Sequence, residues 1–95
     1  MSEDITSLLV RVEGIVQGVG FREFLTMAAA RNRLDGWVRN RADGSVEALV
    51  SGPTKRVEDF VSAATQGPRG ARVKAVDLHN SEPPAGKGFE QLPSL

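Results

Sequence analysis

Apolar and polar residues alternate along four segments of the chain, which is the pattern of β-strands with one buried face. Valine, leucine and isoleucine supply most of the apolar positions, and glycine, proline and aspartate are frequent between the segments. The Asp43-Gly44 pair favours a tight hairpin turn between the second and third segments. The segments expected to form strands are 6–15, 34–41, 45–51 and 72–80, and a short fifth strand is possible at 88–92.

Two further segments repeat apolar residues every three or four positions, which is the spacing of one helix face. The first is 21–31, which lacks glycine and proline, and the second is 53–65, where Pro53 suits the first turn. Asn32 is expected to end the first helix in the left-handed conformation. The buried faces are expected to consist of Phe21, Phe24, Leu25, Ala28 and Ala29 in the first helix and of Val57, Phe60, Val61 and Ala64 in the second.

The order of these elements is β-α-β-β-α-β, which predicts an α+β fold of the ferredoxin-like type. Right-handed crossovers would place both helices on one face of a four-stranded antiparallel sheet, with the possible short strand added near the C-terminus. Ninety-five residues suffice for one domain, so we expect residues 1–95 to form a single domain with a flexible tail at 1–5. Trp37 is expected to be the largest packing group of the second strand and part of the core.

The segment 14–22 connects the first strand to the first helix and contains three glycines. Such a turn can direct several backbone N–H groups at one point beside a helix N-terminus, where an anion is favoured. Arg22 adds a planar fork of donors that fits a phosphate. The spacing fits neither a P-loop nor a dinucleotide-binding loop, and a purely structural turn is the alternative. The amides expected to form the anion cradle are those of Val16, Gln17, Gly18, Val19, Gly20 and Phe21.

Two stretches resemble the signatures of a known family. Residues 14–22 (GIVQGVGFR) resemble the first signature of the acylphosphatase family, and residues 36–46 (GWVRNRADGSV), with Gly52 further on, resemble the second. The resemblance implies the ferredoxin-like fold and the metal-independent hydrolysis of acyl phosphates to a carboxylate and inorganic phosphate. It also implies that Arg22 binds the phosphoryl group together with the loop amides and that Asn40 positions the attacking water.

The same residues allow simpler roles. Arg22 could be a solvated residue of the first helical turn, although a cation there lies at the disfavoured end of the helix dipole. Asn40 could bond the backbone of the hairpin turn, and Gln17 could brace the loop instead of contacting substrate. Glu23 could pair with a neighbouring side chain. Arg33 stands where the family usually has glycine, which indicates a different helix end and concerns local stability.

The rest of the composition limits the chemistry. There is no cysteine and one histidine, His79, so a metal site or a Ser-His-Asp relay has little support, and we expect no metal and no cofactor. No protein general base stands out. A carboxylate leaving group, with a conjugate-acid pKa of about 4, needs none, and an oxygen of the substrate phosphate would accept the proton.

Twelve acidic and twelve basic residues give a formal net charge of zero, which argues against nucleic acid as the main partner. No apolar run approaches the roughly 20 residues of a membrane span. We therefore expect a cytoplasmic monomer that binds a small acyl phosphate, with phosphate or sulfate as a site ligand. The alternatives are a non-enzymatic anion-binding module, a domain of a larger carbamoyl-transfer enzyme, which the chain end at Leu95 disfavours, and an RNA-binding module.

Overall fold

The computed structural model describes residues 4–95, and residues 1–3 of the expected tail lie outside this range. No helix within the described residues is long and apolar enough to cross a membrane. Helix α1 has the predicted bounds, and the strands begin or end within two residues of the predicted positions. The elements, in chain order, are β1 (Ile5–Ile15), α1 (Phe21–Arg31), β2 (Asp35–Asn40), β3 (Val46–Pro53), α2 (Thr54–Gln66), β4 (Arg72–Asn80) and β5 (Phe89–Gln91).

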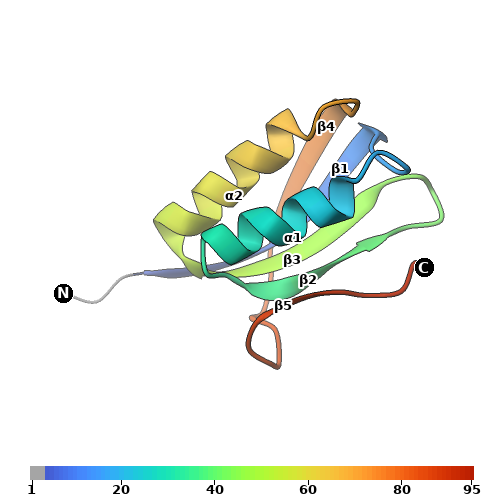
Figure 1. The fold of residues 1–95 in the computed structure, drawn as a ribbon. Helices are drawn as coiled ribbons and strands as arrows, with labels where there is room; N and C mark the ends of the chain where they lie inside the picture. Colours follow the sequence, from blue (N-terminus) through green and yellow to red (C-terminus); the bar gives the residue numbers. More distant parts are fainter. Residues whose placement is uncertain (1–3) are drawn as a thin grey trace.

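The strands form one sheet in the order β4-β1-β3-β2-β5. The pairs β1–β3, β1–β4 and β2–β3 are antiparallel, whereas β5 runs parallel to β2. Both helices lie on the same face of the sheet (Figure 1). The predicted α+β ferredoxin-like fold is confirmed, and the short C-terminal strand makes the sheet five-stranded and mixed.

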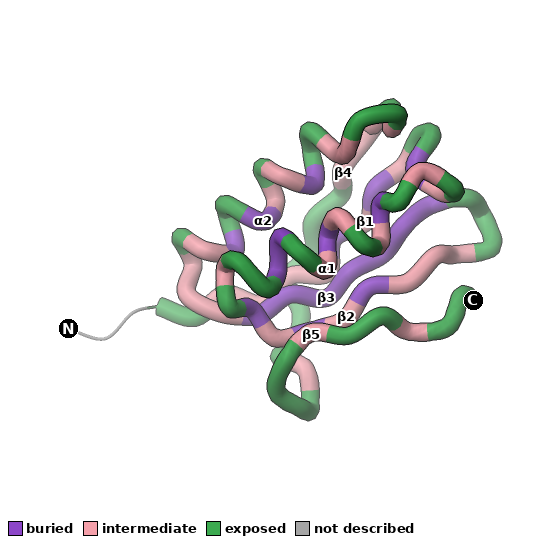
Figure 2. The backbone as a smooth tube through the Cα atoms, in the orientation of Figure 1, coloured by how far each residue is buried: buried purple, intermediate pink, exposed green. Residues whose placement is uncertain are grey.

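The hydrophobic core lies between the sheet and the two helices, where the buried residues of the helices face those of the central strands (Figure 2). Of the residues predicted to form the helix faces, Phe24 and Val61 are only half-buried, and the others are buried or nearly so. Pro53, which we expected in the first turn of α2, is instead the last residue of β3 and precedes the helix. Strands β1 and β3 supply Val10, Val12, Val46, Ala48 and Val50, all fully buried.

Trp37 does not belong to this core, contrary to the sequence prediction. Along β2 the fully buried Val38 faces the helices, so the neighbouring Trp37 projects from the opposite face of the sheet and is half-buried. The Arg39 guanidinium lies 4.7 Å from the centroid of the indole ring, in a cation–π contact. Alternation along a strand places Trp37 and Val38 on opposite faces of the sheet. The large size of the indole does not indicate which of these faces is the core.

The left-handed residue at the end of α1 is Arg33, with φ of 53°, and not Asn32, which has φ of −93°. The Leu34 amide donates to the Ala29 carbonyl and the Arg33 amide to the Ala30 carbonyl, which together make a Schellman motif. This motif places the left-handed conformation on the second residue after the helix, where glycine is favoured. The Asn32 Nδ2 instead donates to the Ala28 carbonyl at 2.9 Å.

We expect Arg33→Gly to stabilise the protein by about 0.5–1 kcal/mol, because glycine removes the steric strain of a Cβ atom at positive φ. The measurement is urea unfolding at neutral pH. Arg33→Ala is the matched control, since it removes the charge but keeps the Cβ, and it should show no comparable gain. Equal stabilities of the Gly and Ala variants would contradict the proposed strain.

Candidate active site

The connection between β1 and α1, residues 16–20, is termed here the glycine loop. Gly18 and Gly20 both have left-handed backbone angles, with φ of 76° and 78°. A Cβ atom at either position would meet no other atom within 4 Å, so the backbone conformation and not space requires glycine there. Residues of alternating handedness direct successive N–H groups toward one side, and this geometry forms an anion-binding concavity.

The first turn of α1 adds further free donors. Gly20 is the N-cap, and no side chain caps the helix. The first hydrogen bond of the helix runs from the Phe24 amide to the Gly20 carbonyl at 3.0 Å. The amides of residues 21–23 therefore have no acceptor within the helix. These donors, at the positive end of the helix dipole, favour an anion in front of them.

Gln17 braces the glycine loop against the hairpin between β2 and β3. Its Nε2 donates to the carbonyl oxygens of Arg41 at 2.8 Å and Ser45 at 2.9 Å. Of the two roles considered for the side chain, the structure therefore shows the bracing role. Since the side-chain amide of Gln17 makes both contacts, they use none of the backbone N–H groups of the glycine loop.

The hairpin is itself fixed by Asp43. The Ser45 amide and hydroxyl both donate to Asp43 Oδ1, at 2.9 and 2.6 Å, and Arg11 pairs with the other carboxylate oxygen. The Ser45 hydroxyl, then the Ser45 amide and, to a smaller extent, Arg11 favour the charged form, so the pKa of Asp43 lies below its ordinary value. The turn that Gln17 contacts is thus stabilised by the hydrogen bonds and the ion pair of Asp43.

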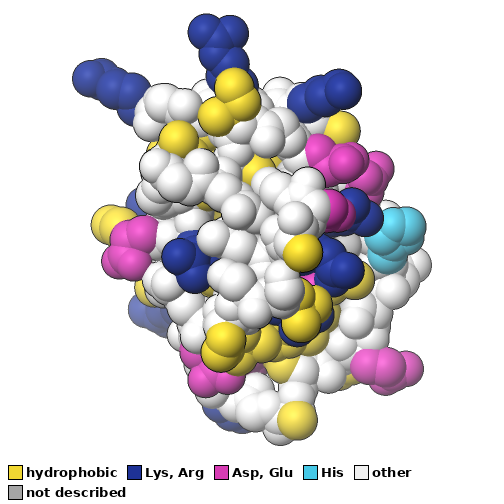
Figure 3. Space-filling model, turned by 90° about the vertical axis from the view of Figure 1, so that its right-hand side faces the viewer, with side chains coloured by type: hydrophobic (Ala, Val, Ile, Leu, Met, Phe, Trp, Pro, Cys, Tyr) yellow, Lys and Arg dark blue, Asp and Glu magenta, His cyan; other side chains and the backbone are white. Residues whose placement is uncertain are grey.

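The glycine loop, the start of α1 and the end of β2 meet around a pocket of about 210 Å³, termed here the loop pocket. It brings Arg22 and Asn40 together with most of the predicted loop residues. Val19 is the exception, because it does not line the pocket and packs against the core. Figure 3 shows this end of the molecule, where Lys and Arg side chains lie on several sides of a largely uncharged centre. The lining residues are Val16, Gln17, Gly18, Gly20, Phe21, Arg22, Glu23, Asn40 and Gln91.

The side-chain oxygen of Asn40 is the most informative atom of the pocket. Asn40 is the last residue of β2, and its Oδ1 is buried without a hydrogen-bond partner among the described residues. In the alternative role the side chain would bond the hairpin backbone through Oδ1 or Nδ2, and Oδ1 makes no such bond to the described residues. A buried acceptor without a partner is costly, so it is expected to receive a hydrogen bond from a molecule in the pocket.

Two lining residues were not assigned to the site by the sequence reasoning. Gln91, from β5, donates through Nε2 to Glu23 Oε2 at 2.9 Å and to Thr26 Oγ1 at 3.2 Å. The sequence analysis considered that Glu23 could pair with a neighbouring side chain, and Glu23 accepts this hydrogen bond from Gln91. The sequence carried no signal for Gln91, because its position follows from the parallel pairing of a three-residue strand with β2.

The opposite face of the hairpin carries a compact group of charges. Glu47 is 7% exposed and lies between Arg39, at 2.9 Å, and Arg41, at 3.2 Å. Arg39 and Glu47 are paired residues of β2 and β3, and by the alternation of the strand Arg39 faces away from Asn40. Arg41 makes two kinds of contact. Its side chain pairs with Glu47, and its backbone carbonyl accepts a hydrogen bond from Gln17 of the glycine loop.

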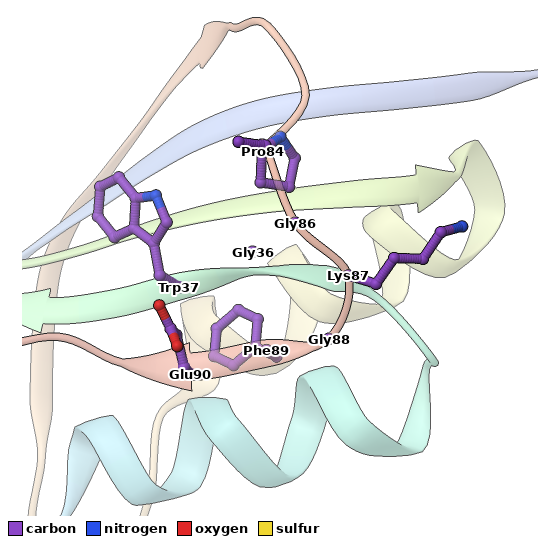
Figure 4. A pocket seen from close by; sticks show the side chains of 9 residues that line it. Gly36, Trp37, Pro84, Gly86, Lys87, Gly88, Phe89 and Glu90 are labelled. Carbon is purple, nitrogen blue, oxygen red and sulfur yellow. The ribbon is translucent and has the colours of Figure 1, made fainter.

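A second cavity, of about 470 Å³, lies between β2 and the segment that precedes β5 (Figure 4). It is lined by Gly36, Trp37, Phe89, Glu90 and residues 84–88. In Figure 4 the indole of Trp37 extends from β2 on the side away from α1, and Pro84 stands on the same side. None of the predicted site residues lines this cavity. Within residues 4–95, no three Asp, Glu or His side chains lie close enough together to hold a metal ion.

The fold and the loop pocket define a small α+β domain with a candidate anion-binding site at a helix N-terminus. The acylphosphatase family profile matches residues 8–91. An acylphosphatase of Azoarcus sp. (strain BH72) is 47% identical over 90 residues, which cover 95% of this chain and 92% of that relative. The chain therefore belongs to the acylphosphatase family, and its activity is the hydrolysis of acyl phosphates.

Solved structures agree with this assignment. The crystal structure of the acylphosphatase from Bacillus subtilis matches with a TM-score of 0.86 at 37% identity, over 94% of this chain and 99% of that one. Full-length HypF in the phosphate- and nucleotide-bound form matches with a TM-score of 0.91 at 28% identity. That match covers 99% of this chain but 12% of HypF.

Replacement of Gln17 by leucine is expected to destabilise the protein by about 1–2 kcal/mol, because two carbonyl oxygens lose their donor. Urea unfolding measures the loss. The matched control is Gln66→Leu at the exposed end of α2, which should change the stability by no more than about 0.5 kcal/mol. If both variants unfold at the same urea concentration, Gln17 does not brace the loop.

Proposed function

We propose that the loop pocket is the catalytic site, in which Arg22 and the amides of residues 16–21 bind the phosphoryl group and Asn40 orients the attacking water. The observation that carries the proposal is the buried Oδ1 of Asn40, which has no hydrogen-bond partner within residues 4–95 and belongs to a residue lining the same pocket as Arg22 and the glycine loop. A site for phosphoryl transfer needs this combination of a charge clamp and a positioned nucleophile.

The phosphoryl group fits the part of the pocket formed by the glycine loop and α1. Its oxygens would accept hydrogen bonds from the free amides and from the guanidinium of Arg22, which can bind two oxygens at once. The full-length HypF structure, of which this chain matches 12%, is a phosphate- and nucleotide-bound form. The cost of placing the Arg22 cation at the positive end of a helix is offset when a phosphate lies between them.

Asn40 would accept a hydrogen bond from the water that attacks phosphorus. Its Oδ1 has no other partner among the described residues, so a water donating to it would satisfy the buried acceptor and present a lone pair to the phosphorus atom. Attack forms the new phosphorus–oxygen bond while the bond to the acyl oxygen breaks. Positioning of this kind supplies a large part of the catalysis of phosphoryl transfer.

The proton released by the water would pass to an oxygen of the phosphoryl group itself. The leaving group is a carboxylate with a conjugate-acid pKa of about 4, so it departs as the anion without protonation by the enzyme. Arg22 and the loop amides supply the positive charge that a metal ion provides in other phosphoryl-transfer enzymes. The products are a carboxylate and inorganic phosphate, and the reaction requires no cofactor.

Asn40→Ala should lower kcat by about 10²–10³ with little change in KM, because the lost interaction acts mainly in the transition state. The assay follows the loss of benzoyl phosphate in the ultraviolet, with EDTA present. Asn80→Ala, at the exposed end of β4, is the matched control and should retain wild-type kinetics. A kcat of Asn40→Ala within a few-fold of wild type would refute the role of Asn40.

A folded wild type that binds phosphate but leaves benzoyl phosphate intact would instead identify the pocket as a binding site only. Hydrolysis that EDTA abolishes would contradict the metal-independent mechanism.

Arg22→Lys should raise the inhibition constant of inorganic phosphate by about tenfold, because an ammonium group cannot reproduce the two-pronged contact of the guanidinium. Competitive inhibition of benzoyl phosphate hydrolysis provides the measurement. Arg31→Lys, in the last turn of the same helix, is the control for a conservative change remote from the pocket. Equal inhibition constants for the two variants would show that Arg22 does not bind the phosphate.

A further inference from the structure

The part of the loop pocket not assigned to phosphoryl binding or to the water is formed by Glu23 and Gln91. Glu23 is the only carboxylate among the lining residues. A pocket of about 210 Å³ that holds a phosphoryl group leaves little further volume, so an attached acyl group must extend along the remaining wall toward the solvent. Glu23 and Gln91 are therefore the candidates to contact it.

The carboxylate of Glu23 is held in place from the other end of the sequence. Gln91 Nε2 donates to Glu23 Oε2 at 2.9 Å, and the same nitrogen lies 3.2 Å from Thr26 Oγ1. The Thr26 hydroxyl in turn donates to the Arg22 carbonyl at 2.8 Å. The first turn of α1, which carries both Arg22 and Glu23, is thus fastened to β5.

This carboxylate is electrostatically unfavourable for an anion-binding pocket. In the first turn it interacts favourably with the helix dipole, but it repels any anion bound nearby. The free amides and Arg22 offset that repulsion for the phosphoryl group that they bind. A second anion on the acyl group would instead lie along the wall to which Glu23 belongs, and a repulsive charge placed against one class of ligand is a usual means of specificity.

We propose that Glu23, positioned by Gln91, selects acyl phosphates whose acyl group is uncharged or cationic over those whose acyl group carries a second anion. This inference rests on the proposed function of the loop pocket. Gln91 acts as a positioning residue, since it also lines the pocket and its Nε2 donates to Glu23 Oε2.

The test compares butyryl phosphate with succinyl phosphate, which has the same number of carbons but carries a free carboxylate at the far end of its acyl group. We expect wild type to prefer butyryl phosphate in kcat/KM. In Glu23→Gln this preference should fall by about threefold at low ionic strength. This is the size expected for two unit charges roughly 8 Å apart when the dielectric constant is close to that of water, because Glu23 is exposed. Glu23→Lys should lower it by about tenfold, and the differences should shrink in 1 M NaCl, where the screening length is about 3 Å.

Glu90→Gln is the matched control. This substitution changes the net charge of the protein by the same amount as Glu23→Gln. Glu90 lies on β5 and lines the second cavity and not the loop pocket. Its preference for butyryl phosphate should equal that of wild type.

The outcomes separate the two proposals. No hydrolysis of butyryl phosphate by folded wild type would refute the proposed function. If wild type hydrolyses butyryl phosphate, an unchanged preference in Glu23→Gln would overturn the charge selection alone. An equal change in Glu23→Gln and Glu90→Gln would also overturn it, because net charge and not the pocket wall would then be responsible.

Discussion

The two hydrogen bonds of the Gln17 side chain are the contacts on which the arrangement of the pocket depends. A loop that offers its backbone N–H groups to an anion cannot use them to hold itself in place, so it needs another support. Gln17 provides this support from the side chain, through the carbonyls of Arg41 and Ser45. Because these carbonyls belong to the hairpin that follows Asn40, the same contacts fix the loop and the asparagine relative to each other.

The hairpin is rigid enough to serve as this support because both of its faces are occupied. On the helix side, Val38 and Val46 are fully buried. On the other side, Glu47 is enclosed by Arg39 and Arg41, and Arg39 stacks on Trp37. Loss of a partner from a buried ion pair is destabilising, so these contacts favour one geometry of the hairpin. The charges on this face thus help to hold the hairpin that Gln17 contacts.

Much of the fold and part of the site could be predicted from the sequence, because they depend on local patterns. The helix of residues 21–31 and the glycine turn before it follow from the spacing of apolar residues and glycines. Trp37 and Asn32 were misjudged for specific reasons. Alternation separates the faces of a strand without saying which is buried, and the handedness of a helix end depends on which residue closes the last turn. Gln91 could not be found, because a three-residue parallel strand is defined by its distant partner.

The strand order places β1, the first strand of the chain, between β3 and β4. Its register pairs Leu8 with Asn80, so one half of the sheet joins residues from opposite ends of the sequence. Chains dominated by such distant pairings fold slowly, because loop-closure entropy is lost before the contacts form. Gln91 lies on β5, which pairs within residues 4–95 with β2 alone, in the first half of the chain. During synthesis the glycine loop and Asn40 therefore emerge first, and the side of the loop pocket that Gln91 lines is completed only when β5 pairs with β2.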